Sequence, residues 1–281
     1  MTNVKAQRVR SVAALGRRSV REREGFFLAE GPQAVREAVR FRPDAVREVF
    51  ADDTGRDRCG EILDAAANRG LPVRDTSPQV LAAMCDTTTP QGVLAVCRRV
   101  DVGLDEVLDG GPGGDVGGEP ETRPEAASVS PRLLVVLTNI RDPGNAGTVI
   151  RGADAAGADA VLVGTNSVDV YNPKVVRSAV GSHFHIPLVL GLDVPALLAR
   201  LRAQGIVSFA ADGTGSVSLY DADLEAPHAW VMGNEAWGLP AELLDACDQA
   251  VAVPLYGKAE SLNLAMAATV CLFASARAQR D

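Results

Sequence analysis

The stretch LLVVLTNIRDPGNAGTVIRGADAAGADAVLVG, residues 133–164, decides the fold of this chain. Two short apolar runs flank a Pro-Gly turn and a segment with helical spacing of apolar residues. Runs this continuously apolar are typical of strands covered on both faces, and a helix between two strands joins them in parallel. The stretch therefore predicts a strand, a helix and a second buried strand of a mainly parallel sheet.

The rest of the second half repeats this alternation. Buried strands are expected over 187–191, 206–212, 229–234 and 251–255, and helices over 175–182, 194–205, 241–247 and 262–278. The first hundred residues alternate on a smaller scale, with strands over 26–30, 46–51, 71–75 and 92–99 and helices over 32–41, 59–68 and 79–86. Strands that alternate with helices predict an α/β fold for both halves.

A change of composition separates the halves. Residues 103–131 are dominated by glycine, proline and acidic residues, with seven acids and one arginine. Such a segment is longer than ordinary connections within a domain. We therefore predict a first domain over 1–102, a flexible acidic linker over 103–131 and a second domain over 132–281.

Charge is distributed unevenly along the chain. The 281 residues carry 28 basic and 36 acidic side chains, a net charge of −8, which excludes a globally basic nucleic-acid binder but not a local basic patch. Residues 1–25 hold seven Lys or Arg against two acids. This stretch is either a solvated helix face or an arm that contacts phosphates.

The cysteines and the apolar runs indicate in which cellular compartment the protein is expected. The five cysteines are scattered without a CxxC pair, which indicates reduced thiols in a cytoplasmic protein. The apolar run from Leu264 to Phe273 is too short to span a bilayer, and no apolar stretch follows the basic N-terminus, so no membrane segment or secretory signal is expected. His183 and His185 flank Phe184 without a third ligand nearby, so we expect no metal site.

Three polar or glycine-rich segments, residues 138–157, 231–240 and 253–268, each follow an expected strand. Ligands of open α/β sheets bind at the carboxyl ends of strands, so these segments form the expected site. Taken singly, each has an ordinary structural explanation. Asn145 and Ser261 can cap helices, Arg151 can be a surface cation, and Trp237 can pack in its loop or stack on a base.

Together, the three segments resemble the signature motifs of the SpoU (TrmH-like) branch of the SPOUT RNA methyltransferases. The matching residues are NIRDPGNAGTVIR (139–151), MGNEAWGL (232–239) and VPLYGKAESLNLAMA (253–267), with family-like character also in 167–182. In the first half, FFLAEGPQAVREA (26–38) and TPQGVLAV (89–96) are similar to the ribosomal protein L30e-like substrate-binding domain of many members.

The resemblance implies a fold, a reaction and partners. It implies a SPOUT-type mainly parallel sheet with a C-terminal deep trefoil knot, preceded by a small L30e-like α/β domain. It implies methyl transfer from S-adenosyl-L-methionine to a ribose 2′-hydroxyl of RNA by a homodimer, without a metal. The two-domain layout favours 23S ribosomal RNA as the substrate over tRNA.

The resemblance also assigns residues. Arg151 matches the family's catalytic arginine, and the polar residues that orient it and line the site are Asn145, Glu235, Ser261 and Asn263. Cofactor binding falls to Gly233, Val253, Leu262, Thr138, Asn139 and Pro254, the first because a side chain there would block the adenosine. RNA contacts are expected from Arg8, Arg10, Arg17, Arg18 and Arg141.

Physical chemistry constrains the role of Arg151. A free arginine has a pKa above about 12, so Arg151 suits a cation that stabilises a developing alkoxide better than it suits a general base. Alternatives that stay open are a tRNA methyltransferase, an antibiotic-resistance rRNA methyltransferase and a non-catalytic RNA-binding protein on the same scaffold. A nucleotide-binding oxidoreductase is set aside, because the strand at 133–137 does not lead into a G-x-G-x-x-G loop.

Overall fold

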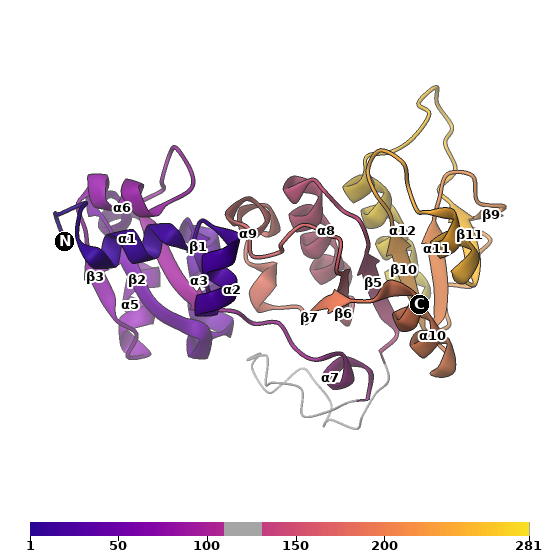
Figure 1. The fold of residues 1–281 in the computed structure, drawn as a ribbon, viewed down its shortest axis with the longest axis horizontal. Coiled ribbons are helices and arrows are strands. Elements are labelled where there is room, and N and C mark those ends of the chain that lie inside the picture. Colours follow the sequence, from indigo (N-terminus) through magenta and orange to yellow (C-terminus); the bar gives the residue numbers. More distant parts are fainter. Residues whose placement is uncertain (110–130, 281) are drawn as a thin grey trace. The chain divides into compact units, whose positions relative to one another are not determined.

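The computed structural model describes residues 1–109 and 131–280, which fall into two compact units (Figure 1). The first unit combines residues 1–100 with 169–185, and the second comprises 101–109, 131–168 and 186–280. The first stretch of the first unit ends at Val100, whereas the sequence places the boundary after residue 102. In addition, residues 169–185, which lie within the expected second domain, pack with the first unit. Residues 110–130 of the expected linker lie outside the described residues.

A four-stranded sheet organises the first unit. Its order is β1-β4-β2-β3, with β4 antiparallel to β1 and β2, and β2 parallel to β3. The strands are β1 (Phe26–Glu30), β2 (Val46–Ala51), β3 (Val73–Asp75) and β4 (Val93–Arg98). The helices are α3 (Pro32–Phe41), η1 (Pro43–Ala45), α4 (Asp53–Arg58), α5 (Gly60–Asn68), α6 (Pro78–Met84), α9 (Pro173–Ala179) and η2 (Ser182–Phe184).

The basic N-terminus is folded onto this unit as two helices, in agreement with the interpretation of this stretch as a helix face. It forms α1 (Gln7–Ala14) and α2 (Arg18–Glu24), and α1 packs against α6. The apolar side chains of Val9, Val12, Leu15 and Val20 are buried in the unit's core. Burial of one apolar stripe holds the two helices down and leaves most of their arginines on the outer face.

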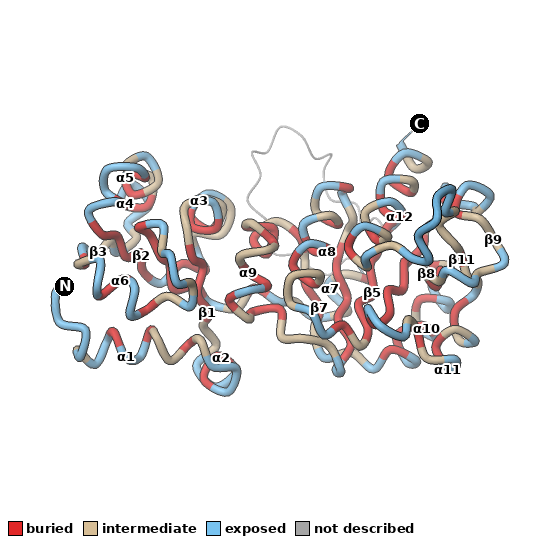
Figure 2. The backbone as a smooth tube through the Cα atoms, turned by 90° about the horizontal axis from the view of Figure 1, so that it is seen from above, coloured by how far each residue is buried: buried red, intermediate tan, exposed pale blue. Residues whose placement is uncertain are grey.

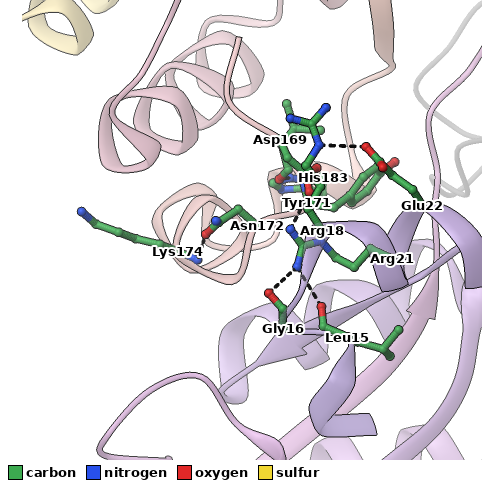
Figure 3. A network of polar contacts seen from close by, with 11 residues as sticks. Leu15, Gly16, Arg18, Arg21, Glu22, Asp169, Tyr171, Asn172, Lys174 and His183 are labelled. Carbon is green, nitrogen blue, oxygen red and sulfur yellow. Dashed lines mark hydrogen bonds and ion pairs between the residues drawn. The ribbon is translucent and has the colours of Figure 1, made fainter. Parts of the chain in front are cut away.

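One arginine of this segment is buried instead. Arg21 is 2% exposed and donates hydrogen bonds to the carboxylate of Asp169 at 3.0 Å and to the carbonyl oxygens of Leu15 and Gly16 at 2.8 and 2.7 Å (Figure 3). These three acceptors compensate a guanidinium that burial would otherwise make very costly. The ion pair ties the start of residues 169–185 to the N-terminal helices.

A seven-stranded parallel sheet organises the second unit, in the order β7-β6-β5-β10-β8-β11-β9. The central strands are buried along their whole length (Figure 2). This confirms the parallel sheet that the continuous apolar runs predict. The strands are β5 (Leu133–Leu137), β6 (Ala160–Gly164), β7 (Leu188–Leu192), β8 (Val207–Ala211), β9 (Val217–Ser218), β10 (His228–Met232) and β11 (Gln249–Ala252).

Helices cover both faces of the parallel sheet. One face packs against α7 (Leu104–Leu108), α10 (Val194–Ala203) and α11 (Ala241–Ala246) through a cluster that contains Leu134 and Val231. The other face carries α8 (Pro143–Ala156) and α12 (Leu264–Ala278), which lie side by side. There, Ser275 of α12 accepts a hydrogen bond from the Trp230 indole at 2.9 Å.

The first residues of the expected linker form helix α7. Leu108 is buried in the core of the second unit, and Arg200 forms ion pairs with Asp105 and Asp109 at 2.6 and 2.8 Å. Residues 104–108 are therefore part of the folded unit, although the sequence predicts a tether from residue 103.

The strand order places a switch point between β5 and β10. After β5 the chain adds β6 and β7 on one side, and then crosses over to build β8 and β10 on the other. Loops that leave neighbouring strands at such a point diverge and open a crevice at the carboxyl edge of the sheet. Two of the three polar segments begin there.

Candidate active site

An open cleft of about 580 Å³ lies at this switch point. All three polar segments contribute to its walls, as the sequence predicts. The lining residues are Arg141, Asp142, Asn145, Asn234, Glu235, Ala236, Trp237 and Asn263.

Glu235 joins the loop after β10 to the start of α8. Its carboxylate accepts hydrogen bonds from the backbone N–H groups of Arg141 at 3.3 Å and Asp142 at 3.1 Å, and from the Asn145 side-chain amide at 3.4 Å. A carboxylate held at a helix N-terminus is favoured by the exposed amides and by the helix dipole. The Glu235 carboxylate therefore binds the N-terminus of α8 and is not without hydrogen-bond partners in the cleft.

The third segment joins through Asn263, whose Nδ2 donates to Asn145 Oδ1 at 3.0 Å. Asn263 also caps α12, since its Oδ1 accepts from the backbone N–H of Ala265 at 2.9 Å. The expected cap, Ser261, precedes the helix and is exposed.

Helix α8 also has a different cap from the expected one. Asp142 caps it and accepts from the Asn145 N–H at 2.8 Å, so Asn145 lies inside the first turn. Freed from capping, the Asn145 side chain bridges Glu235 and Asn263.

Asn234 is a site residue that the sequence argument does not single out. It is 6% exposed, its side chain donates to the Asn139 carbonyl at 2.8 Å, and its Oδ1 accepts from the Ala236 N–H at 2.8 Å. Asn139 has a positive φ of 58°, a conformation that Asn adopts more readily than most residues. An asparagine directly after a strand and glycine is a recognisable turn signal.

The structure gives Gly233 a reason that the sequence does not show. A Cβ at Gly233 would lie 2.4 Å from the carbonyl carbon of Gly238, because Asn234 and Gly238 exchange backbone hydrogen bonds of 2.8 and 2.9 Å across the loop. The glycine is thus required by the close approach of the loop to itself. A Cβ at this position would displace the loop that carries Glu235 and Trp237.

The loop 253–262 has the character of a ligand-binding segment. It lies between β11 and α12 and is half-buried or exposed throughout. Among the described residues, no backbone hydrogen bond involves this stretch. Its N–H and C=O groups are therefore available to an adenosine or amino-acid moiety, which fits the cofactor expected at Val253, Pro254 and Leu262.

The structure does not bring every expected residue into the cleft. Arg151 lies on α8 six residues beyond Asn145 and is exposed, and within the described part of the chain it forms no hydrogen bond to the residues that line the cleft. Thr138 is buried at the end of β5, where its N–H donates to the Met232 carbonyl at 3.0 Å. Ser261, Gly233, Val253, Pro254 and Leu262 are also absent from the cleft wall.

The expected RNA-contacting arginines differ in their pairing. Arg8 forms an ion pair with Glu48 at 3.4 Å, and Arg18 with Glu22 at 2.8 Å. Arg10 and Arg17 are exposed and have no ion pair within the described part of the chain. Arg141 lines the cleft.

His183 and His185 belong to the first unit. The His183 ring is buried beside Phe27 and Tyr171 and hydrogen-bonds with the Val170 carbonyl at 2.8 Å. Burial lowers its pKa to about 4. Within residues 1–109 and 131–280, no group of three or more His, Cys, Asp or Glu could hold a metal ion, and no helix is long and apolar enough to cross a membrane.

Solved structures share this architecture over both units. An rRNA methyltransferase from Sinorhizobium meliloti with bound AdoMet superposes with a TM-score of 0.79 at 27% identity, covering 99% of this chain and 97% of that one. The SpoU methyltransferase AviRb from Streptomyces viridochromogenes, in complex with AdoMet, gives 0.78 at 29% identity, covering 97% and 98%. The fold and the cleft therefore define a two-domain protein of the SpoU methyltransferase class.

Sequence comparisons give the same result. Residues 132–273 match the SpoU rRNA Methylase family, and residues 28–102 match the RNA 2′-O ribose methyltransferase substrate-binding family. The chain is 32% identical to the 23S rRNA (guanosine(2553)-2′-O)-methyltransferase RlmP of Bacillus subtilis, over 96% of both proteins. It is 31% identical to the 23S rRNA (guanosine-2′-O-)-methyltransferase RlmB of Bordetella pertussis, over 88% of this chain and 95% of that protein. The chain belongs to the SpoU rRNA methylase family.

Proposed function

We propose that this chain is an S-adenosyl-L-methionine-dependent enzyme that methylates a guanosine ribose 2′-hydroxyl in 23S rRNA. The observation that carries the proposal is the link between the three polar segments, in which Asn145 bridges Glu235 and Asn263 at the switch point of the sheet. Two relatives that match over most of the chain are named as 23S rRNA guanosine methyltransferases, which favours this substrate over tRNA.

The cofactor would be held mainly by backbone. The free groups of the loop 253–262 and the backbone at Gly233 suit an adenosyl group, with Thr138, Asn139 and Pro254 beside them. When bound, S-adenosylmethionine supplies an activated methyl group on sulfur. The protein's part is to place the 2′-oxygen of the ribose in line with that methyl, because positioning supplies much of the rate of a two-reactant step.

Arg151 would act on the charge that develops on the ribose oxygen. As a permanent cation, it stabilises an alkoxide better than it accepts a proton. Asn145, Glu235, Ser261 and Asn263 would orient substrate and cofactor around it. The exposure of Arg151 leaves its guanidinium free to reach a bound RNA ribose or phosphate.

RNA binding would be shared between the two units. The match of residues 28–102 to a substrate-binding family supports a role of the first unit in holding RNA. Arg10 and Arg17 are the best placed of the expected contacts there, with Arg8 and Arg18 available after exchange of their surface ion pairs. In the second unit, Arg141 stands at the cleft.

The active form would be a cytoplasmic homodimer whose catalytic domain contains the deep trefoil knot that the resemblance implies. Helix α12 supports a dimer. Met266, Val270 and Phe273, spaced four and three residues apart on one side of the helix, are 61%, 38% and 49% exposed. An apolar stripe of this kind on a helix is typical of a surface that another chain covers.

Transfer of labelled methyl from S-adenosylmethionine to purified 23S rRNA, 16S rRNA and tRNA tests the proposal. We expect label in 23S rRNA alone, mapped to one guanosine 2′-oxygen. The Arg151→Ala variant is expected to lose activity by about 100-fold or more while cofactor binding and melting temperature are retained, since the side chain is exposed. Retained turnover in this variant would remove Arg151 from the mechanism, and label in tRNA alone would contradict the substrate assignment.

A further inference from the structure

A second cavity lies in the first unit, and the proposed reaction does not use it. Its volume is about 210 Å³, below the ~300 Å³ that sites for drug-sized ligands usually reach. It therefore suits a group the size of a single ring system rather than a whole S-adenosylmethionine. The residues of its wall used below are Glu30, Gln33, Thr89, Gln91, Arg177 and Val180.

The wall is held in place by a buried carboxylate. The side chain of Glu30, which is 3% exposed, accepts hydrogen bonds from the backbone N–H groups of Asp86 at 2.8 Å and Thr87 at 3.2 Å. Arg177 of α9 bridges Glu30 at 3.1 Å and Asp86 at 3.0 Å. The loop after α6 and the helix α9 are thus fixed to the end of β1, so the cavity is formed before any ligand arrives.

The charges around the cavity are already compensated. Arg177 is neutralised by two carboxylates, and Glu30 by Arg177 together with two backbone donors. Burial raises the pKa of the Cys85 thiol, which also lines the cavity, to about 12, so this group is neutral. A buried carboxylate in the wall disfavours a phosphate, and the absence of a spare negative charge disfavours a cation. The expected occupant is neutral and polar.

The other polar side chains of the lining can both donate and accept hydrogen bonds. They are the amides of Gln33 and Gln91 and the hydroxyls of Thr87 and Thr89. The Gln91 side chain lies close to Gly31, because a Cβ added to Gly31 would be 3.1 Å from the Gln91 Oε1. Val180, the residue that follows α9, also lines the cavity and has a positive φ of 52°, which is rare for a β-branched residue.

We propose that this cavity binds one unpaired nucleobase of the RNA substrate, apart from the nucleotide that is methylated. A base is flat, neutral and edged with donors and acceptors, which matches the lining groups. Proteins read RNA sequence mainly at splayed-out bases of this kind. Residues 1–100 carry 17 basic and 13 acidic side chains, while the whole chain has a net charge of −8, so RNA approaches this unit favourably. The proposal rests on RNA being the substrate.

Substitutions at the mouth of the cavity test the proposal on the full-length chain. Thr89→Trp would fill the cavity, whereas Thr88→Trp places the same bulk on the neighbouring exposed residue outside it. We expect Thr89→Trp and Gln91→Ala to weaken binding of 23S rRNA about 10- to 100-fold, the order of magnitude for loss of one hydrogen-bonded base contact. Thr88→Trp should bind normally. In all three variants the turnover at saturating RNA and the cofactor affinity should be unchanged.

Small probes identify the chemical group that binds. AMP, GMP, CMP and UMP at millimolar concentration, with ribose 5-phosphate as the control, are titrated while the side-chain amide NMR signals of Gln33 and Gln91 are followed. We expect shifts with at least one nucleotide and none with ribose 5-phosphate. Equal shifts with ribose 5-phosphate would indicate a phosphate site and overturn the proposal, as would no shift with any nucleotide.

The two proposals fail separately. If wild-type protein methylates no RNA but Gln91 responds to a nucleotide, the reaction is rejected and the base pocket stands. If 23S rRNA is methylated and bound equally well by Thr89→Trp and Thr88→Trp, the pocket is rejected and the reaction stands.

Discussion

Asn263 Nδ2 donates a 3.0 Å hydrogen bond to Asn145 Oδ1, and the same Asn263 side chain caps α12 through the N–H of Ala265 at 2.9 Å. One residue thus closes the N-terminus of the last helix and joins it to α8, whose Asn145 also contacts Glu235 at 3.4 Å. This amide joins the third polar segment to the first, which Glu235 already links to the second.

Substitution of Asn263 can separate its two roles. Asn263→Ala removes the cap and the link, so we expect about 1 kcal/mol of lost stability, or roughly 3 °C in melting temperature, together with a large loss of methyl transfer. Asn263→Asp keeps an oxygen to cap the helix but loses the donor to Asn145. Calorimetry should therefore find it nearly as stable as wild type, while its kcat/KM falls. Equal activity of the Asp variant and wild type would show that the link is not needed.

Gly233 can be compared with Gly257, a glycine of the third polar segment. Gly233→Ala places a Cβ 2.4 Å from the Gly238 carbonyl carbon, whereas Gly257→Ala enters open space. We expect the first variant to weaken S-adenosylmethionine binding at least tenfold, because the loop after β10 must move, and the second, which displaces no atom and keeps the backbone groups of its loop, to leave the affinity nearly unchanged. Isothermal titration with the cofactor measures the difference. Normal affinity in Gly233→Ala would mean that this loop does not contact the cofactor.

The Arg21–Asp169 pair should be important for stability because it is buried. Asp169→Asn leaves a guanidinium that is 2% exposed without its anion, for which the expected loss is about 3 kcal/mol. Glu22→Gln breaks the Arg18–Glu22 pair, whose side chains are 61% and 53% exposed, and should lose less than about 1 kcal/mol. Urea denaturation compares the two. The double variant Arg21→Met, Asp169→Asn should regain part of the loss, and an Asp169→Asn effect as small as that of Glu22→Gln would contradict the argument.

His183 should make the first unit sensitive to acid. Burial lowers its pKa from the ordinary 6.5 to about 4. The native pKa is below the unfolded one, so the unfolded state takes up the proton first. The contribution of the neutral His183 ring to the free energy of unfolding is complete above about pH 6.5. It falls by roughly 3 kcal/mol as the pH drops toward 4. The variant His183→Gln should show a flatter dependence when the free energy of unfolding is measured from pH 7.5 to 4.5. Parallel curves for both proteins would exclude this contribution.

The stripe on α12 predicts the oligomeric state. Phe273→Arg places a charge where the homodimer would bury a ring that is now 49% exposed. Light scattering should find a dimer for wild type and a monomer for the variant, with activity reduced. The control Tyr220→Arg changes another exposed aromatic residue, 64% exposed and outside α12, and should leave the molar mass unchanged. A monomeric wild-type protein would contradict the proposed assembly.

Local patterns predict most elements of this fold. The parallel sheet follows from continuous apolar runs, since LLVVL and AVLVG can be buried on both faces only in such a sheet. The three polar segments follow from their positions after strands. The patterns leave two interpretations open at α1 and α2 with their many arginines, and they fail at the acidic α7, where charges mask a helix. In these helices a few buried apolar residues outweigh a polar composition.

Helix capping shows a second limit. Asn145 and Ser261 have the right chemistry to cap, but Asp142 and Asn263 occupy those positions. Several residues near each helix start can accept from the first N–H groups, and packing selects one of them. The choice matters for function, because it frees Asn145 to bridge two other segments.

The sequence by itself determined which segments become strands and helices and which loops carry polar side chains, because apolar spacing and turn chemistry act within a few residues. Only the tertiary structure decided which of these side chains meet. The contact between Asn145 and Asn263 spans 118 residues, and that between Arg21 and Asp169 spans 148. Such pairs depend on strand order and on the packing of distant segments, which local patterns do not specify. The second cavity has the same origin, since its walls come from β1, the loop after α6 and α9.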